Sequence, residues 1–81
     1  MKLPRDVSGE DLARALRRFG YELTRQTGSH MRLTSIFKGS QHHVTVPAHP
    51  RVKIGTLADI LNDVALYLDV SRERLVRELF G

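Results

Sequence analysis

A hairpin pattern at residues 30–47, HMRLTSIFKGSQHHVTVP, decides the fold. Polar and apolar side chains alternate from His30 to Phe37, which predicts a strand with two different faces. The apolar face carries Met31, Leu33 and Phe37, and the polar face carries His30, Arg32 and Thr34. Lys38-Gly39-Ser40 is typical of a hairpin loop, and residues 42–46 form the returning strand, which Pro47 stops.

A further strand precedes this hairpin. Residues 21–26 alternate apolar and polar side chains, and Thr27-Gly28 turns the chain into the next strand. Three strands joined by short turns predict an antiparallel meander. Such a sheet can bury one face against the core and leave the other face in water.

Helices are expected before and after the meander along the chain. Ser8 is placed to cap a helix that carries Leu12, Leu16 and Phe19 at helical spacing and ends at Gly20. Thr56 with Asp59 predicts a capping box for a second helix. The apolar stripe of that helix consists of Leu57, Ile60, Leu61, Val64 and Leu68. Ser71 is expected to cap a short last helix with Leu75, Val76, Leu79 and Phe80 as its apolar residues.

These elements predict an α+β fold in one domain over residues 1–81. The order is α-β-β-β-α with a three-stranded antiparallel sheet, helices on one face, and a short C-terminal helix. This is the arrangement of double-stranded-RNA-binding domains. Because many functions can share one architecture, the fold alone leaves the function open.

Composition narrows the class of protein. The chain has no cysteine, which excludes a disulfide framework, a thiolate zinc site and a cysteine nucleophile, and fits a reducing cytoplasm. No apolar run approaches the ~20 residues of a membrane helix. The N-terminus, Met1-Lys2-Leu3-Pro4-Arg5, lacks the apolar stretch of a signal peptide. We therefore expect a cytoplasmic protein without a membrane partner.

Charge is distributed unevenly along the chain. Residues 1–55 hold ten Lys and Arg against four Asp and Glu, whereas residues 56–81 hold three Arg against five acids. The basic part is also the part that carries all four histidines. This asymmetry favours a polyanionic partner such as RNA or DNA over a merely solvated basic surface.

The hairpin register sorts the histidines into two groups. If the loop centres on Gly39, His30 lies opposite Ala48 and beside His49. His42 then lies at the other end of the hairpin, roughly 20 Å from His30. His30 and His49 can share a site, whereas His42 and His43 mark the hairpin end.

His30 is the candidate proton-transfer residue. Imidazole titrates near neutral pH, so it can accept the proton of a ribose 2′-hydroxyl or protonate a departing 5′ oxygen. Arg25, Arg32 or Lys53 is expected to stabilise charge at the phosphate. His49 is either a polar loop residue or the second acid or base. The alternative for His30 is an ordinary histidine on the wet face of a strand.

No metal site is predicted. His42 and His43 are neighbours on a strand, so their side chains point to opposite faces and do not readily chelate one ion. No cysteine and no neighbouring carboxylate completes a ligand set for them.

Three motifs together resemble the HicA family of bacterial toxins, also called YcfA-like mRNA interferases. They are Gly28-Ser29-His30, the run from His42 to Pro47, and the Gly55-Thr56-Leu57 start of a helix that continues through Ile60 and Leu61. The resemblance extends from Ser8 to about Leu61, and the acidic C-terminal piece departs from it.

The resemblance implies the double-stranded-RNA-binding-domain-like fold and a toxin of a type II toxin–antitoxin pair. Such a toxin cleaves mRNA without a metal or other cofactor and is held inactive by a HicB-type antitoxin. It implies that His30 is the catalytic residue. Contacts to RNA are then expected from Arg25, Ser29, Arg32, His43, His49 and Lys53.

Two rival functions share the basic face. One is a non-catalytic RNA-binding module, and the other is an interaction subunit that has lost activity. Only the enzyme requires the imidazole of His30, and the intact Gly28-Ser29-His30 motif counts against the inactive subunit. The oligomeric state does not follow from the sequence.

Overall fold

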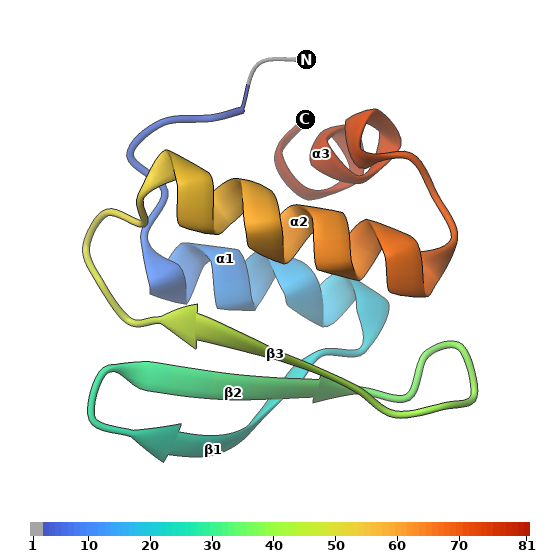
Figure 1. The fold of residues 1–81 in the computed structure, drawn as a ribbon, viewed down its shortest axis with the longest axis horizontal. Coiled ribbons are helices and arrows are strands. Elements are labelled where there is room, and N and C mark those ends of the chain that lie inside the picture. Colours follow the sequence, from blue (N-terminus) through green and yellow to red (C-terminus); the bar gives the residue numbers. More distant parts are fainter. Residues whose placement is uncertain (1–2) are drawn as a thin grey trace.

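The computed structural model describes residues 3–81 and contains one three-stranded antiparallel sheet with helices before and after it (Figure 1). In chain order the elements are α1 (Gly9–Leu16), the 3-10 turn η1 (Arg17–Phe19), β1 (Glu22–Thr27), β2 (His30–Ser35), β3 (His42–Pro47), α2 (Ile54–Leu68) and α3 (Arg72–Phe80). This confirms the predicted α+β class and element order. Met1 and Lys2, which belong to the segment considered for a signal peptide, lie outside the described residues.

The helices cover one face of the sheet, and the other face is open (Figure 1). Met31 and Leu33 of β2 and Val44 and Val46 of β3 point to the covered face and are buried. They pack with apolar residues of the helices, and the predicted stripe of α2 is buried throughout: Leu57, Ile60, Leu61, Val64 and Leu68. The core therefore lies between the sheet and the helices.

The central hairpin pairs one residue away from the expected register. His30 pairs with Pro47 rather than Ala48, and Ser35 rather than Ile36 pairs with His42. Ser35, the partner of His42, lies five residues along the strand from His30, which corresponds to about 17 Å. The predicted separation of the histidines into two groups is therefore confirmed.

The far end of β2 differs from expectation. The strand ends at Ser35, so Phe37 lies beyond the alternating pattern and is 58% exposed instead of buried with Met31 and Leu33. Ser35 takes the last inward position and donates a hydrogen bond to the Phe19 carbonyl at 2.7 Å. Phe37 packs edge-on against the Phe19 ring instead. A hydroxyl bonded to the end of η1 thus replaces the expected aromatic contact.

The helix caps follow the sequence at three of four places. Ser8 accepts a hydrogen bond from the Asp11 amide at 3.0 Å, Ser71 accepts one from the Arg74 amide, and Gly20 adopts φ 79° after η1. The Thr56–Asp59 capping box is wrong. Helix α2 begins at Ile54, and its N-cap Lys53 makes no side-chain cap bond. Because the N-cap lies three residues earlier than expected, Thr56 lies inside the first turn.

The last helix folds back onto the core. Leu75 and Val76 of α3 are buried, and Leu79 and Phe80 pack against the same cluster. The core therefore covers the apolar side of α3. No helix within residues 3–81 has the length and apolarity needed to cross a bilayer.

Tyr21 and His42 form a polar cluster that joins the sheet to α2. The Tyr21 hydroxyl lies 2.6 Å from His42 Nδ1, and His42 Nε2 lies 3.1 Å from an Asp63 carboxylate oxygen. The His42 ring also stacks on Tyr67. Burial raises the pKa of Tyr21 far above its usual value, helped by the nearby Tyr67 and Asp63. The Asp63 carboxylate accepts from His42 Nε2–H, and in this tautomer Nδ1 accepts from the Tyr21 hydroxyl, which stays protonated.

Replacing this hydroxyl tests the cluster. Tyr21→Phe leaves His42 Nδ1 without its partner, so we expect the free energy of unfolding to fall by about 1–2 kcal/mol. Urea denaturation monitored by circular dichroism measures the change. Thr24→Val, which removes a hydroxyl hydrogen-bonded at the exposed surface, is the control and is expected to cost less. Equal stability of Tyr21→Phe and the parent protein would contradict the proposed role.

Gly9 allows α1 to approach the end of β3. A Cβ on Gly9 would lie 1.9 Å from the Pro47 carbonyl oxygen, which is backbone and has no rotamer with which to move away. The Gly9 amide donates to the His49 carbonyl at 2.9 Å. The hydrogen bond holds the loop after β3 against the first helix, and the absence of a side chain at Gly9 makes this close approach possible.

Two glycine substitutions separate this contact from helix propensity. Gly9→Ala is expected to destabilise the protein by about 2 kcal/mol or more, because the backbone must shift. Gly55→Ala in α2 meets no atom within 4 Å and is expected to stabilise by about 0.5–1 kcal/mol. Thermal unfolding of both variants makes the comparison. Similar effects of the two would rule out the close approach at Gly9.

Candidate nucleic-acid interface

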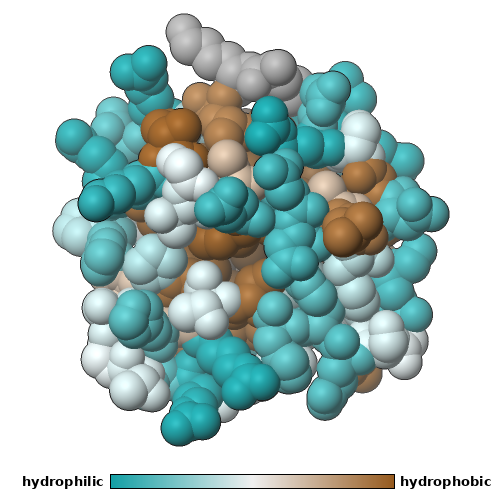
Figure 2. Space-filling view, in the orientation of Figure 1, coloured by the Kyte–Doolittle hydropathy of each residue, from teal (hydrophilic) through white to brown (hydrophobic). Residues whose placement is uncertain are grey.

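The open face of the sheet carries the polar positions of β2 and β3. His30, Arg32 and Thr34 pair across the hairpin with Pro47, Thr45 and His43. Partners directly opposite each other in an antiparallel pair lie on the same face. Figure 2 shows hydrophilic and neutral side chains along the bottom of the molecule, where this sheet lies, while hydrophobic side chains gather among the helices. The face is therefore wet and polar.

A tight turn places His30 at the start of β2. Gly28 and Ser29 form a two-residue loop closed by the pairing of Thr27 with His30. Gly28 adopts φ 58°, a conformation that other residues rarely adopt and that suits the first central position of a type II′ hairpin turn. The Ser29 carbonyl accepts a hydrogen bond from the Ala48 amide. This bond links the turn to the loop that carries His49.

His30 and His49 line one recess, as the register predicts. The recess has a volume of about 370 Å³ and is lined by His30, Thr45, Pro47, His49, Lys53 and Thr56. His30, His49 and Lys53 are exposed. Within residues 3–81, neither histidine ring forms a hydrogen bond to another group of the chain. Two imidazoles and an ammonium group are therefore available to a ligand in this recess, which we call the histidine recess.

A second recess on the same face groups the other sequence candidates. It has a volume of about 410 Å³ and is lined by Thr24, Arg25, Arg32, Thr34, Gln41 and His43. Thr34 lies 2.8 Å from His43 Nδ1 and 2.8 Å from the Thr24 hydroxyl, which orients the His43 ring. The two recesses adjoin because Arg32 of one is the cross-strand partner of Thr45 of the other. We call the second one the arginine recess.

Two arginines face each other inside the arginine recess. A β-bulge between Leu23 and Arg25 shifts the register of β1, and Arg25 then pairs directly with Arg32. Like charges in opposed strand positions destabilise a sheet. No acidic side chain lines this recess to compensate for the pair. A bound polyanion would remove the repulsion, which makes the pair a strong electrostatic indication of the ligand class.

The remaining predicted residues lie apart from these recesses. Ser29 is exposed in the turn, but its side chain lines neither recess. His42 points inward to Tyr21, Asp63 and Tyr67, so the two neighbouring histidines do face opposite sides of the strand. Within the described residues, no cluster of three or more His, Asp or Glu side chains is arranged to hold a metal ion.

Sequence reasoning missed the threonines of the interface. Thr45 follows His43 by two positions, so its place on the open face follows from strand alternation alone. Thr34 could be placed on the polar face, but its bond to His43 requires the register. Thr56 was interpreted as a helix cap and instead lines the histidine recess.

Comparison with known families addresses the same part of the chain. Residues 9–66 match a family model described as the HicA toxin of bacterial toxin–antitoxin systems. The matched region spans α1 through most of α2 and excludes α3. No curated protein and no solved structure matches the chain. The family match covers well over half of the sequence and confirms the resemblance carried by the three motifs, so the chain belongs to the HicA toxin family.

Proposed function

We propose that this HicA-family toxin is an endoribonuclease that cleaves mRNA, with His30 as the proton-transfer residue. The observation that carries the proposal is the histidine recess, where His30 and His49 stand beside Lys53 on an open, polar sheet face. Family membership supports a toxin, and the recess supports acid–base chemistry at a phosphate. The proposed reaction uses no cofactor.

The reaction needs two proton transfers and no added reagent. The ribose 2′-oxygen bonds to the adjacent phosphorus, and the bond from phosphorus to the 5′-oxygen breaks. A base takes the 2′-hydroxyl proton, and an acid gives a proton to the departing 5′-oxygen. The products are a 2′,3′-cyclic phosphate and a 5′-hydroxyl. His30 performs one transfer and His49 the other, while the Lys53 ammonium group stabilises the charge that develops on the phosphate oxygens.

The arginine recess holds the substrate beside the reacting phosphate. Arg25 and Arg32 both line it, and each guanidinium can bind a phosphate oxygen pair in a bidentate manner. His43 lines the same recess, and its bond to Thr34 uses Nδ1, so Nε2 has no hydrogen-bond partner within residues 3–81. Successive phosphates of one strand therefore lie along the line from Arg32 to His30.

The partner of a toxin of this class is a cognate antitoxin. We assign it to the HicB type and place the complex in the cytoplasm, where mRNA is found. The chain offers a basic face for inhibition, since the arginine recess contains no acidic side chain. An antitoxin that covers the histidine recess with acidic side chains would exclude RNA by occupying the same surface.

Replacing His30 tests the catalytic assignment. His30→Ala is expected to lower the cleavage rate by about 10²–10⁴-fold, because one proton-transfer group is lost. The fold is expected to persist, since the side chain is exposed and bonds to no other described group. Cleavage of a labelled RNA and arrest of growth on expression are the measurements.

His43→Ala is the matched control on the same face. It removes an imidazole from the arginine recess, so we expect a higher KM and a nearly unchanged kcat. A folded His30→Ala protein that cleaves RNA at the parental rate would refute the assignment. Retained RNA binding with no cleavage by the parent protein would instead favour the non-catalytic binding module.

Chelation tests the predicted independence from metals. Within residues 3–81 no carboxylate lines the histidine recess, and three or more ligands gather nowhere else. We expect cleavage to persist unchanged in EDTA. Loss of cleavage that a divalent ion restores would replace the two-histidine scheme with metal-assisted chemistry.

A further inference from the structure

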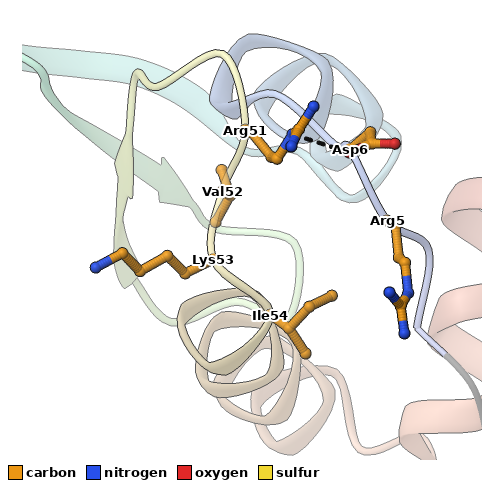
Figure 3. A pocket seen from close by; sticks show the side chains of 6 residues that line it. All are labelled: Arg5, Asp6, Arg51, Val52, Lys53 and Ile54. Carbon is orange, nitrogen blue, oxygen red and sulfur yellow. Dashed lines mark ion pairs between the residues drawn. The ribbon is translucent and has the colours of Figure 1, made fainter.

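A third recess lies on the other side of Lys53 from the histidine recess. Its volume is about 250 Å³, and its lining comes from the amino-terminal segment, the loop after β3 and the first residue of α2: Arg5, Asp6, Arg51, Val52, Lys53 and Ile54 (Figure 3). We call it the amino-terminal recess. None of Arg5, Asp6 and Arg51 was a sequence candidate for RNA contact.

Backbone hydrogen bonds hold this recess in shape. The Val52 amide donates to the Val7 carbonyl at 2.8 Å, and the Gly9 amide donates to the His49 carbonyl at 2.9 Å. These two bonds tie the segment before α1 to the loop after β3. Arg5 and Arg51 are far apart in the sequence, yet they line one recess because of this connection.

The recess is positively charged. Asp6 is its single acid, and the Asp6 carboxylate lies 2.9 Å from Arg51 Nε. This contact orients the Arg51 guanidinium through Nε, so its two terminal nitrogens do not take part in the ion pair (Figure 3). Arg5 forms no ion pair within residues 3–81. A second guanidinium is thus free for an anion.

Lys53 connects this recess with the histidine recess. The residue lines both, and Figure 3 shows its side chain extending away from Arg5 and Arg51. The backbone of Lys53 therefore separates two adjacent anion sites, while its ammonium group serves the histidine side. The two recesses therefore adjoin at Lys53.

We propose that the amino-terminal recess binds a further backbone phosphate of the RNA strand, beside the phosphate cleaved at His30. This inference rests on the proposed ribonuclease function and extends its binding surface. The Arg5 guanidinium holds the phosphate, Arg51 beside Asp6 adds positive charge to the recess, and the half-exposed Ile54 side chain provides an apolar wall for a sugar or base. The role is one of substrate positioning and binding, since these residues lie outside the histidine recess.

The chemistry favours a nucleic-acid phosphate. The planar Arg5 guanidinium matches the oxygens of a phosphodiester, and in the proposed function the same strand supplies a phosphate on the other side of Lys53. Linked sites of this kind bind a long strand more tightly than a short one, because the second contact is intramolecular. A partner protein's carboxylate is the competing ligand.

Binding of uncleavable 2′-O-methyl oligonucleotides tests the proposal without requiring cleavage. The affinity of the parent protein is expected to rise from a dinucleotide to a hexanucleotide. Arg5→Gln is expected to weaken hexanucleotide binding by about three- to tenfold and to leave dinucleotide binding unchanged. The slope of log Kd against log salt should fall by about one unit. Arg77→Gln, which removes the same charge from an exposed position of α3, is the matched control.

A hexanucleotide series with one neutral methylphosphonate locates the phosphate. One position should weaken binding to the parent protein and cause no further loss in Arg5→Gln, because both changes remove the same contact. Equal behaviour of Arg5→Gln and Arg77→Gln would overturn the proposal while leaving His30 catalysis intact. Weakened antitoxin binding with unchanged RNA binding would show a protein-binding recess instead. Failure of the parent protein to bind any oligonucleotide would overturn the ribonuclease proposal itself.

Discussion

The pairing register of β2 with β3 is the constraint on which the other features depend. It sends Met31, Leu33, Val44 and Val46 into the core and, by the same alternation, sets His30 and Arg32 in water. A slip by one residue would exchange the two faces along a whole strand. Burial of the apolar set therefore fixes the interface as firmly as it fixes the core. The register places His30 in the histidine recess, and the bonds from the Ala48 amide to Ser29 and from the Gly9 amide to His49 place the loop that carries His49.

The interface nevertheless contains an arrangement that works against folding. Arg25 faces Arg32 across the sheet, and no acidic side chain lines the recess that they share. The β-bulge in β1 produces this pairing. Proteins tend to break local rules of stability where they bind or react. Here the departure from the rule lies on the sheet face for which we propose RNA binding.

Much of this organisation was accessible from the sequence, and the exceptions share a cause. Alternation predicted the strands, and helical spacing predicted the stripe of α2, since each depends on residues close together in the chain. The grouping of His30 with His49 needed only an approximate register.

The errors arose where distant segments meet. Ser35 ends β2 because its hydroxyl reaches the carbonyl of Phe19, and this contact is invisible in the local pattern that placed Phe37 inside. Similarly, Thr56 with Asp59 has the spacing of a cap, but α2 starts at Ile54. The amino-terminal recess combines Arg5 with Arg51 through bonds between Val7 and Val52, so no sequence window contains it.

The outer edge of β1 has a consequence for the behaviour of the protein in a crowded cell. In the described fold β1 is the first strand of the order β1-β2-β3, so one row of its backbone groups has no strand beside it. Such an edge is a template for pairing between molecules and for fibre growth. All six residues of β1 are exposed, Glu22 and Arg25 place charges on it, and the bulge twists its line. The strand that carries half of the arginine pair therefore also resists pairing with the edge of a second molecule.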